Sequence, residues 1–567
     1  MGDAYPTGQT RGDGGRVGMT MLRRWQGTLL GAAALITVLT VLARLTGFGR
    51  NLVFARTVGA TCLNSTYQTV NTVPNILYEI VAGGALASLV VPLLARAVTA
   101  GDRDHVDRTA SALLTWTVVV LTPLAVGIAV AAEPISRLML GDGSCDGSVE
   151  VGASMLRVFA PQVVLYGVGI VLTGILQAHR RFGGPALAPL LSSLVVIGAY
   201  LSYAVVAPRG TDIDTLTTGQ ELILSVGTTL GVVVLSLSLL VPISRLGLRL
   251  RPTFGFPEGV APHVRALAAA GMAALAAQQA SIAVVLVLGN QASEVAVAVY
   301  MQAQTIYFLP WAVLAVPIAT TVFPRLAERW SAGDRESYRT QLAASTQLVI
   351  LVSMGAAAAM VAAARPLARV IFQNAPGVDS VDALTEGVIG FAAGLVGYGL
   401  FALLSRALYA ARTMGATAIA CVTGWAAVIV ADLILSAVMS DADRVLALAL
   451  GNSLGMTVLG AALLAVVVRT TGRSAVSGVG QVVVVSAVAA VVAGWVGWWF
   501  EARIDSGGVA LAVLQGLLAA AVATAIFAAI VAGLARGAVR QSLAALRGSR
   551  VPPSATAARR VEQDEEA

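Results

Sequence analysis

Two arginines, Arg44 and Arg50, lie inside the first long apolar segment, which runs from about residue 29 to about residue 59. About 20 helical residues cross the ~30 Å hydrocarbon core of a membrane, so Arg44 falls near mid-depth. A charge there costs about 2.5–3.5 kcal/mol and should face a water-filled cavity or a partner. Gly47 and Gly49 could bend the helix so that both guanidinium groups point into one cavity. Because guanidinium binds phosphate through paired hydrogen bonds, the pair predicts an anion site inside a membrane protein. A structural ion pair for Arg44, with Arg50 reaching the membrane surface, is the alternative.

Polar side chains recur every four residues along the second apolar segment, at Tyr67, Asn71, Asn75 and Glu79. A spacing of four places them along one slowly drifting face of a helix. Polar groups at membrane depth face a bundle interior or a cavity, and hydrogen bonding between helices is an equal alternative to lining a cavity. Glu79 is also a candidate counter-ion for one of the arginines. The predicted substrate-binding residues are Arg44, Arg50, Asn51, Gln68, Asn71, Asn75 and Glu79.

An isolated acid, Asp432, interrupts a long apolar run in the last third of the chain. A buried acid in a transporter often serves a cation or a proton. Asp432 and Asn452, on the next apolar segment, are therefore candidates for a coupling site for Na⁺ or H⁺. A structural hydrogen bond between these two side chains is the other interpretation. No cofactor is expected.

The composition defines the broad class of protein. The chain has 567 residues, of which 57% are hydrophobic and only 12% charged, and its mean hydropathy is +0.81. Soluble domains carry about 25% charged residues, so we predict an all-α polytopic membrane protein with about fourteen transmembrane helices. The basic excess behind the formal net charge of +7 lies in loops and tails. There, arginines set orientation and contact anionic membrane lipids, which argues against nucleic-acid binding.

The three cysteines include no CxxC pair, and the three histidines fall in predicted loops. This leaves no metal-ligand cluster and no Ser/His/Asp arrangement, so we predict no metal site and no catalytic residue, and we expect the protein not to be an enzyme. Cys62 and Cys145 fall on the same predicted outer side. A disulfide between them is one alternative, and two free thiols, which we favour from the sequence, are the other.

Two sequence motifs recur with the same offset of 232 residues. Pro92-Leu-Leu-Ala-Arg96 is repeated from Pro324, and Leu176-x-Ala-x-Arg180 is repeated from Leu408. The repeat predicts two pseudo-symmetric six-helix lobes around a central cavity, followed by two C-terminal helices. Arginines concentrate in alternate loops, which places both termini in the cytoplasm. The expected organisation is a cytoplasmic N-terminal tail (1–27), an N-lobe (28–244), a C-lobe (245–468), two helices outside the repeat (469–535) and a disordered cytoplasmic tail (536–567).

The first two segments carry a family resemblance in Ala43-Arg-Leu-Thr-Gly-Phe-Gly-Arg-Asn51, Val73-Pro-Asn75 and Gly84-Ala-Leu-Ala-Ser-Leu-Val-Val-Pro92. They resemble the MurJ (MviN) lipid II flippase family of the multidrug/oligosaccharidyl-lipid/polysaccharide exporter superfamily, and the Lys-free, Ala/Arg-rich sequence suggests an actinobacterial member. The resemblance implies export of the undecaprenyl-pyrophosphate-linked peptidoglycan precursor lipid II by alternating access. It also implies a groove for the lipid tail at the last two helices and a location in the bacterial cytoplasmic membrane.

The sequence departs from the family pattern at four positions that usually carry charge: Asn51, Ser65, Tyr78 and Thr305. The cavity would keep only part of its usual charge, so other functions stay open. One is a flippase for another polysaccharide-lipid, or a drug or cation antiporter of the same superfamily, although the paired arginines argue against a cation. The other is a non-transporting homologue that scaffolds cell-wall synthesis or division proteins. For the flippase, an interior-negative potential gives about 2.3 kcal/mol per charge per 100 mV, enough to drive an anionic headgroup outward without ATP.

Overall fold

The computed structural model describes residues 29–80, 87–141, 145–255, 260–503, 508–534 and 537. All regular elements in this part of the chain are helical. The expected tails, 1–27 and 536–567, lie outside the described residues except for residue 537. The first half contains α2 (Leu29–Thr57), α3 (Cys62–Tyr78), α4 (Ala87–Ala100), α5 (Arg103–Val130), α6 (Ala132–Leu140), α7 (Ser148–Phe159), α8 (Gln162–Ala178), α9 (Gly183–Val206), α10 (Thr218–Leu237) and α11 (Leu240–Ser244).

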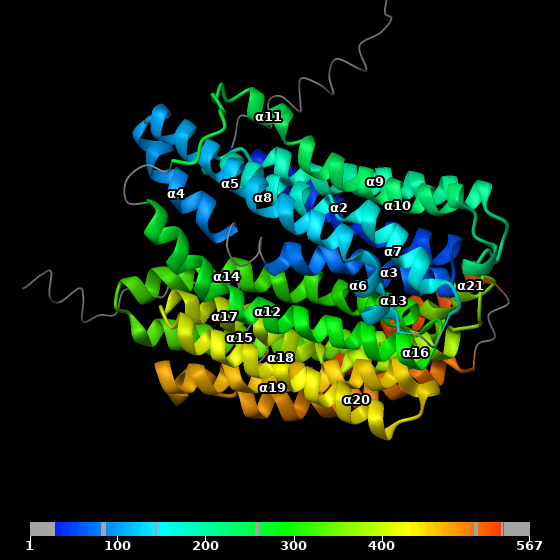
Figure 1. The fold of residues 1–567 in the computed structure, drawn as a ribbon. Coiled ribbons are helices and arrows are strands. Elements are labelled where there is room, and N and C mark those ends of the chain that lie inside the picture. Colours follow the sequence, from blue (N-terminus) through cyan, green and yellow to red (C-terminus); the bar gives the residue numbers. More distant parts are fainter. Residues whose placement is uncertain are drawn as a thin grey trace, which may run out of the picture.

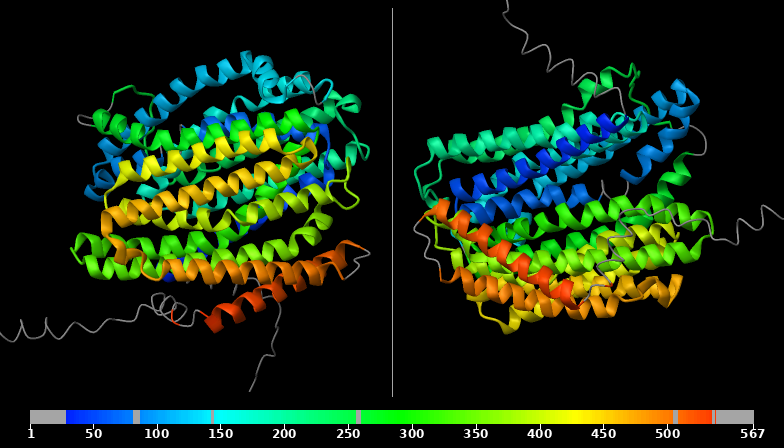
Figure 2. Two further views of the ribbon diagram at one scale, coloured as in Figure 1. Left: turned by 90° about the horizontal axis from the view of Figure 1, so that it is seen from below. Right: turned by 180° about the vertical axis from the view of Figure 1, so that it is seen from behind.

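The second half contains α12 (Val260–Ala292), α13 (Ala296–Pro310), a π-helical turn η3 (Trp311–Ala315), α14 (Val316–Ser331), α15 (Arg335–Phe372), α16 (Val381–Ala392), α17 (Leu395–Ala410), α18 (Met414–Val438), α19 (Arg444–Thr471), α20 (Val479–Glu501) and α21 (Val509–Leu534). Most of these helices run roughly parallel across the molecule, and α2–α11 form one layered bundle beside α12–α19 (Figure 1). We call these bundles the N-lobe and the C-lobe. Helices α20 and α21 pack against α15 along one side of the C-lobe (Figure 2).

The apolar helices match the expected membrane spans. Twelve helices among the described residues are long and apolar enough to cross a membrane, and α16 with α17, bent by 44°, adds a thirteenth when counted as one span. They correspond to thirteen of the fourteen predicted segments. The remaining predicted segment, 65–97, is occupied by α3 and α4, with residues 81–86 between them outside the described part. The prediction of a polytopic all-helical fold is therefore confirmed.

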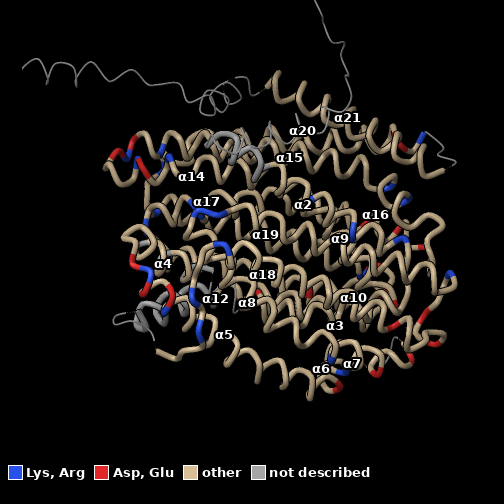
Figure 3. The backbone as a smooth tube through the Cα atoms, turned by 90° about the horizontal axis from the view of Figure 1, so that it is seen from above, with Lys and Arg blue, Asp and Glu red and all other residues tan. Residues whose placement is uncertain are grey.

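Charged side chains gather toward the two ends of the helices, and the long middle sections are almost free of them (Figure 3). We call the end that joins α4 to α5, α8 to α9, α14 to α15 and α17 to α18 the arginine-rich end. The opposite end joins α2 to α3, α6 to α7, α9 to α10 and α15 to α16. This distribution follows from the cost of burying an isolated charge in hydrocarbon.

The internal repeat extends to backbone geometry. Arg180 and Arg412, 232 residues apart, both adopt a left-handed conformation, with φ of 56° and 59°. Such a conformation is uncommon outside glycine, so its recurrence at equivalent turns is specific to the repeat. Asp102 and Asp334, also equivalent, each cap the helix that follows them by accepting a backbone hydrogen bond at 3.0 Å. Hydrogen bonds from the side chain and the backbone amide of Ser337 stabilise the carboxylate of Asp334 and lower its pKa.

The lobes pack internally through small residues and aromatic clusters. One N-lobe core surrounds Phe54, Tyr67 and Tyr200, whereas a single large core joins the C-lobe to α20 and α21. In lipid, close helix contact depends on small residues rather than on a hydrophobic driving force. Gly397 of α17 shows this, because a Cβ there would overlap the carbonyl of Met456 on α19.

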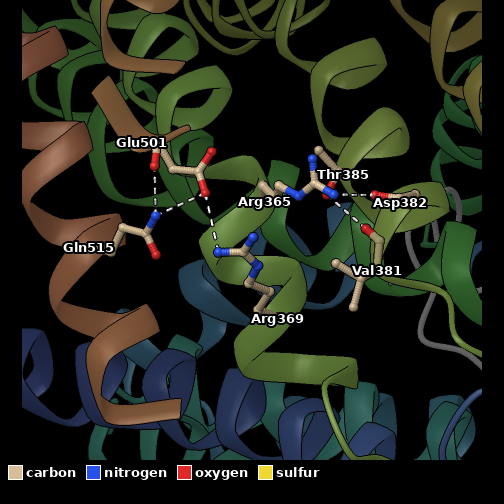
Figure 4. Close-up of polar contacts among 7 residues, drawn as sticks. All are labelled: Arg365, Arg369, Val381, Asp382, Thr385, Glu501 and Gln515. Carbon is tan, nitrogen blue, oxygen red and sulfur yellow. Dashed lines mark hydrogen bonds and ion pairs between the residues drawn. The ribbon is translucent and has the colours of Figure 1, made fainter. Parts of the chain in front are cut away.

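A buried polar network attaches the α20–α21 pair to α15 (Figure 4). Glu501, 2% exposed at the end of α20, lies 3.5 Å from the Arg369 guanidinium and accepts a 3.0 Å hydrogen bond from Gln515 of α21. A second pair nearby, Arg365 with Asp382 at 3.0 Å, is exposed. Loss of one partner from a buried ion pair leaves an uncompensated buried charge, which is strongly destabilising. The buried Glu501–Arg369 contact therefore holds α20 against α15 more strongly than the exposed Arg365–Asp382 pair could.

Candidate functional site

The two arginines that the sequence singles out lie on the same helix, α2, which packs against α9 of the N-lobe. Arg44 is exposed and makes no hydrogen bond or ion pair with the described residues. Arg50 is half-buried and lies close enough to the hydroxyl groups of Tyr166 and Tyr200 to interact with them electrostatically. The structural ion pair considered for Arg44 is thus not formed within the described part of the chain. Both guanidinium groups keep hydrogen-bonding capacity for an anion.

The residue after Arg50 connects the two lobes. Asn51 donates a 3.1 Å hydrogen bond from its Nδ2 to the Thr305 hydroxyl of α13, and that hydroxyl donates to the Met301 carbonyl at 2.9 Å. Asn51 and Thr305 are two of the positions at which the sequence departs from the family pattern. The structure brings them together as a neutral pair, which satisfies both polar groups without a charge in the membrane.

The polar face of α3 becomes more exposed toward the arginine-rich end. Tyr67 is buried and bonded to the Tyr200 hydroxyl at 2.8 Å, Asn71 and Asn75 are half-buried, and Glu79 is exposed. Of the two alternatives for this stripe, hydrogen bonding between helices therefore holds for Tyr67, whose hydroxyl belongs to the N-lobe core. Gln68 is also half-buried, so the side chains beyond Tyr67 are partly accessible and the last of them, Glu79, is exposed.

Neighbouring polar groups on α3 differ in how well they are satisfied. Asn75 donates from its Nδ2 to the Asn71 backbone carbonyl at 2.9 Å. The buried Oδ1 atom of Asn71 has no hydrogen-bond partner among the described residues. A buried polar atom without a partner costs free energy, so the Asn71 amide is available to a ligand or to water.

Glu79 lines a pocket of about 340 Å³ formed by the end of α3 with α8, α9 and α10. The ring of Tyr78 packs on that of Tyr166 with centroids 4.5 Å apart and forms part of its wall. Glu79 makes no ion pair with Arg44 or Arg50, so its predicted role as their counter-ion is not seen. It instead lines a pocket whose walls are mostly apolar, with Thr173, Gln177 and Ser236 as polar side chains in the lining.

The opposite end of the interface between lobes is closed by contacts that the sequence analysis missed. Arg56 of α2 donates from Nη1 to the Val370 and Gln373 carbonyls, at 3.2 and 3.0 Å, at the C-terminus of α15. Ala60 forms a parallel bridge across the lobes, with its amide bonded to Pro376 at 3.0 Å and its carbonyl to Val378 at 2.9 Å. A guanidinium at a helix C-terminus meets unsatisfied carbonyls and the negative end of the dipole.

Three more hydrogen bonds join the lobes at this end. Asn290 of α12 donates to the Thr69 hydroxyl at 2.9 Å and to the Met139 carbonyl at 3.0 Å, and the Ala298 amide donates to the Ser65 hydroxyl at 3.3 Å. Ser65 is another position that departs from the family pattern, and here its hydroxyl is buried between the lobes. The lobes therefore meet tightly at the opposite end.

A disulfide links Cys62 at the start of α3 to Cys145 before α7, with the Cα atoms 6.3 Å apart. The preference for two free thiols is therefore wrong. The two residues are separated by 83 positions, and only the tertiary fold shows that they meet. The carboxylate of Asp212 accepts hydrogen bonds from the Cys62 and Leu63 amides at 3.1 and 2.8 Å, which fixes the same helix start.

The predicted coupling residues lie on adjacent helices of the C-lobe. Asp432 of α18 is fully buried, and neither carboxylate oxygen has a hydrogen-bond partner among the described residues. Asn452 of α19 is also buried, with its Oδ1 unpartnered there. The alternative interpretation, a structural hydrogen bond between these two side chains, is therefore not seen. No group of three or more potential metal ligands occurs in the described part of the chain, so whether an ion binds here stays a prediction.

A separate apolar groove of about 750 Å³ runs between α13, α15 and α21. Its lining includes Leu309, Leu351, Met360, Phe527 and Val531. This groove differs chemically from the polar interface between the lobes, because almost all of its lining atoms are apolar.

Two pseudo-symmetric helical lobes, closed at one end and exposing cationic and polar side chains between them, define a multi-pass membrane transporter. The sequence model described as lipid II flippase MurJ matches residues 54–531. The chain therefore belongs to the MurJ family of lipid II flippases. The resemblance seen in the first two segments is confirmed across most of the chain.

Similar proteins agree with this assignment. The lipid II flippase MurJ of Burkholderia cenocepacia is 26% identical over 388 residues, covering 66% of this chain and 73% of that protein. A probable lipid II flippase MurJ of Rhizobium meliloti is 24% identical over 339 residues, covering 59% and 62%. The fold is similar to a solved lipid II flippase MurJ in an inward closed conformation, with a TM-score of 0.71 at 17% identity over 88% of this chain and 99% of that one. It is also similar to an inward-facing MATE multidrug transporter of the MOP superfamily, with a TM-score of 0.62 at 16% identity over 79% and 99% of the chains.

Proposed function

We propose that this protein is a transporter, with no catalytic reaction, that moves lipid II from the inner to the outer leaflet of the bacterial cytoplasmic membrane by alternating access. The observation that carries the proposal is the placement of Arg44 and Arg50 on the helix that also joins the lobes. The pyrophosphate of lipid II is held by these guanidinium groups, which bind phosphate oxygens in pairs. Asn51, Gln68, Asn71 and Asn75 supply neutral hydrogen-bonding groups for phosphate or sugar.

We infer the orientation from the arginine asymmetry, which puts the arginine-rich end and both termini in the cytoplasm. The more exposed end of α3 then lies toward the cytoplasm, and the Arg56 and Ala60 contacts close the outer side. Opening that side requires those contacts to break. A headgroup with two uncompensated negative charges gains about 4–5 kcal/mol per 100 mV on moving outward. The membrane potential is therefore a sufficient driving force.

Ion coupling is a second element of the proposal. Asp432 and Asn452 present unpartnered oxygens in a buried site between α18 and α19, and carboxylate and amide oxygens suit Na⁺ or a proton. Binding there would favour the lobe arrangement in which α18 and α19 pack most closely. The apolar groove at α21 takes the lipid tail, and anionic lipids contact the arginine-rich end. Cell-wall synthesis or division proteins are the protein partners that fit this role.

The test is complementation of a strain depleted of its own lipid II flippase, with accessibility of lipid II in the outer leaflet as the readout. The wild-type chain should restore exposure, whereas Arg44→Ala and Arg50→Ala should abolish it. The matched control is Arg137→Ala, which removes an exposed arginine paired with Glu133 at the opposite end. It should behave as the wild type.

Two outcomes would contradict the proposal. A well-inserted wild type that leaves lipid II in the inner leaflet would exclude export of this cargo. Full activity of both arginine variants would exclude them as the headgroup site, even if the chain transports lipid II. Equal membrane abundance of all four proteins must be shown by immunoblot, so that a folding defect is recognised.

A further inference from the structure

Four aromatic side chains pack against one another on the C-lobe, and we call them the aromatic shelf: Phe308 is exposed, Trp311 and Phe401 are half-buried, and Tyr398 is buried. Their ring centroids are separated by 4.6 Å for Trp311–Tyr398 and by 5.8 Å for both Phe308–Tyr398 and Tyr398–Phe401. The Trp311 indole N–H donates to the Tyr398 carbonyl at 3.2 Å, which fixes the centre of the shelf. Trp311 begins the π-helical turn η3, and such turns are frequent at functional sites.

Two contacts place the shelf beside the interface between the lobes. On α13, Thr305 is bonded to Asn51 of the N-lobe, and Phe308 lies on the same helix face one turn nearer the arginine-rich end. Phe308 is 37% exposed, which is unusual for a phenylalanine beside a lobe interface. On α17, Tyr398 is close enough to Glu79 of α3 to interact with it electrostatically across the interface. Phe401, one turn further along α17, is half-buried.

The chemistry of the surroundings indicates what the shelf binds. The shelf is aromatic, and the N-lobe elements that meet the C-lobe beside it carry polar groups: Glu79 follows α3 and lies near Tyr398, and α2, which bears the two arginines, contacts α13 at Asn51. A ligand that fits has a ring with one C–H face and a hydroxylated edge, because the partly positive C–H groups stack on the negative aromatic face while hydroxyls bond to carboxylate and amide groups. A hydrocarbon chain would leave those polar groups without hydrogen-bond partners. The apolar groove at α21 is the better site for such a chain.

We propose that the aromatic shelf is a sugar-binding subsite that stacks against a pyranose ring of the cargo headgroup. This inference rests on the proposed function, because it assigns a part of the lipid II headgroup to the C-lobe while the pyrophosphate lies at Arg44 and Arg50 of the N-lobe. The cargo would then touch both lobes at once. With the aromatic shelf on the C-lobe and the two arginines on the N-lobe, the protein favours a cargo in which a sugar is linked directly to a diphosphate.

The experiment compares two ligands on the full chain in lipid nanodiscs: lipid II, which carries the disaccharide, and undecaprenyl pyrophosphate, which carries no sugar. Phe308→Leu removes the ring but keeps an apolar side chain of similar size. It should weaken lipid II binding about three- to tenfold, in the range measured for aromatic stacking, and leave undecaprenyl pyrophosphate binding unchanged. Phe308→Tyr keeps the ring and should bind both lipids as the wild type does.

Phe323→Leu on α14 is the matched control, because Phe323 is also 37% exposed but lies outside the shelf. It should change neither affinity, and thermal unfolding of each variant shows whether it is folded. An equal loss of both lipids in Phe308→Leu, or no loss of either, overturns the sugar subsite. Wild type that binds undecaprenyl pyrophosphate with no preference for lipid II overturns the subsite alone. Wild type that binds neither lipid overturns the subsite together with the proposed function.

Discussion

The contact of Arg56 with the end of α15 allows a quantitative prediction of how readily the two lobes separate at the end opposite the arginine-rich end. Its guanidinium donates two hydrogen bonds, at 3.2 and 3.0 Å, to carbonyls of the other lobe. A hydrogen bond to a charged group contributes about 1.5–3 kcal/mol in a protected site, and the half-exposed position of Arg56 reduces this. We take about 2–4 kcal/mol for the two bonds together. Arg56→Ala should therefore shift the equilibrium toward the state open at the opposite end by roughly 30-fold to several hundred-fold.

The assay is the labelling rate of a cysteine placed in the closed contact. Ala298 is buried between the lobes beside Ser65, so Ala298→Cys reports opening when it reacts with a membrane-impermeant maleimide added from outside. Cys421 is buried and is replaced by alanine in the background. Labelling should be faster in Arg56→Ala and unchanged in Arg137→Ala, an exposed arginine at the same end. A labelling rate for Arg56→Ala equal to or below that of the parent protein would refute the reasoning.

Three further changes test the packing. Glu501→Ala removes the partner of Arg369 and Gln515 in the buried network and should destabilise the protein by about 3–5 kcal/mol, seen as a lower Tm in detergent. Arg365→Ala, in the exposed pair with Asp382, should cost at most about 1 kcal/mol. Similar Tm losses for both variants would contradict the distinction between the buried and the exposed pair. Gly397→Ala places a Cβ against the Met456 carbonyl and should cost about 1–3 kcal/mol, while Gly480→Ala, with open space around it, should be neutral or stabilising by up to about 1 kcal/mol; an unchanged Tm for Gly397→Ala would show that α17 and α19 separate without cost. Cys145→Ala opens the disulfide across 83 positions and should cost at most about 4.5 kcal/mol. Its Tm should no longer respond to a reductant, and a wild-type Tm that is itself insensitive to reductant would contradict the link.

The sequence was sufficient for features that depend on local pattern. The length of the apolar segments predicted the membrane spans, and two short motifs repeated 232 residues apart predicted the two lobes. Both patterns can be recognised from short stretches of sequence without knowledge of the tertiary fold. The exposure of Arg44 also followed from its depth, since a charge at mid-membrane must reach water or a partner. Burial of Asp432 followed from its apolar neighbours in the same way.

Features that join distant residues could not be predicted. Asn51 meets Thr305 across 254 positions, and Arg56 meets Gln373 across 317. Tyr67 fits the spacing of the polar stripe, but its helix turns it into the N-lobe core, where Tyr200 satisfies its hydroxyl. The Cys62–Cys145 bond likewise depends on how α3 and α7 are packed. Periodicity identifies a helix face but not the element that covers it.

The bridge between Ala60 and residues 376–378 has a consequence for how this family can vary. Its hydrogen bonds join main-chain atoms only, so they do not depend on the identity of most side chains nearby. The exceptions are Gly59 and Gly377, which have φ of 81° and 88° and whose Cβ atoms, if present, would overlap the Pro376 and Ala60 carbonyls. Substitutions of side chains beside the bridge should therefore leave its hydrogen bonds intact as long as these two glycines are kept. Closure of this end thus combines a backbone bridge that depends on two glycines with side-chain contacts, such as that of Arg56, that depend on residue type.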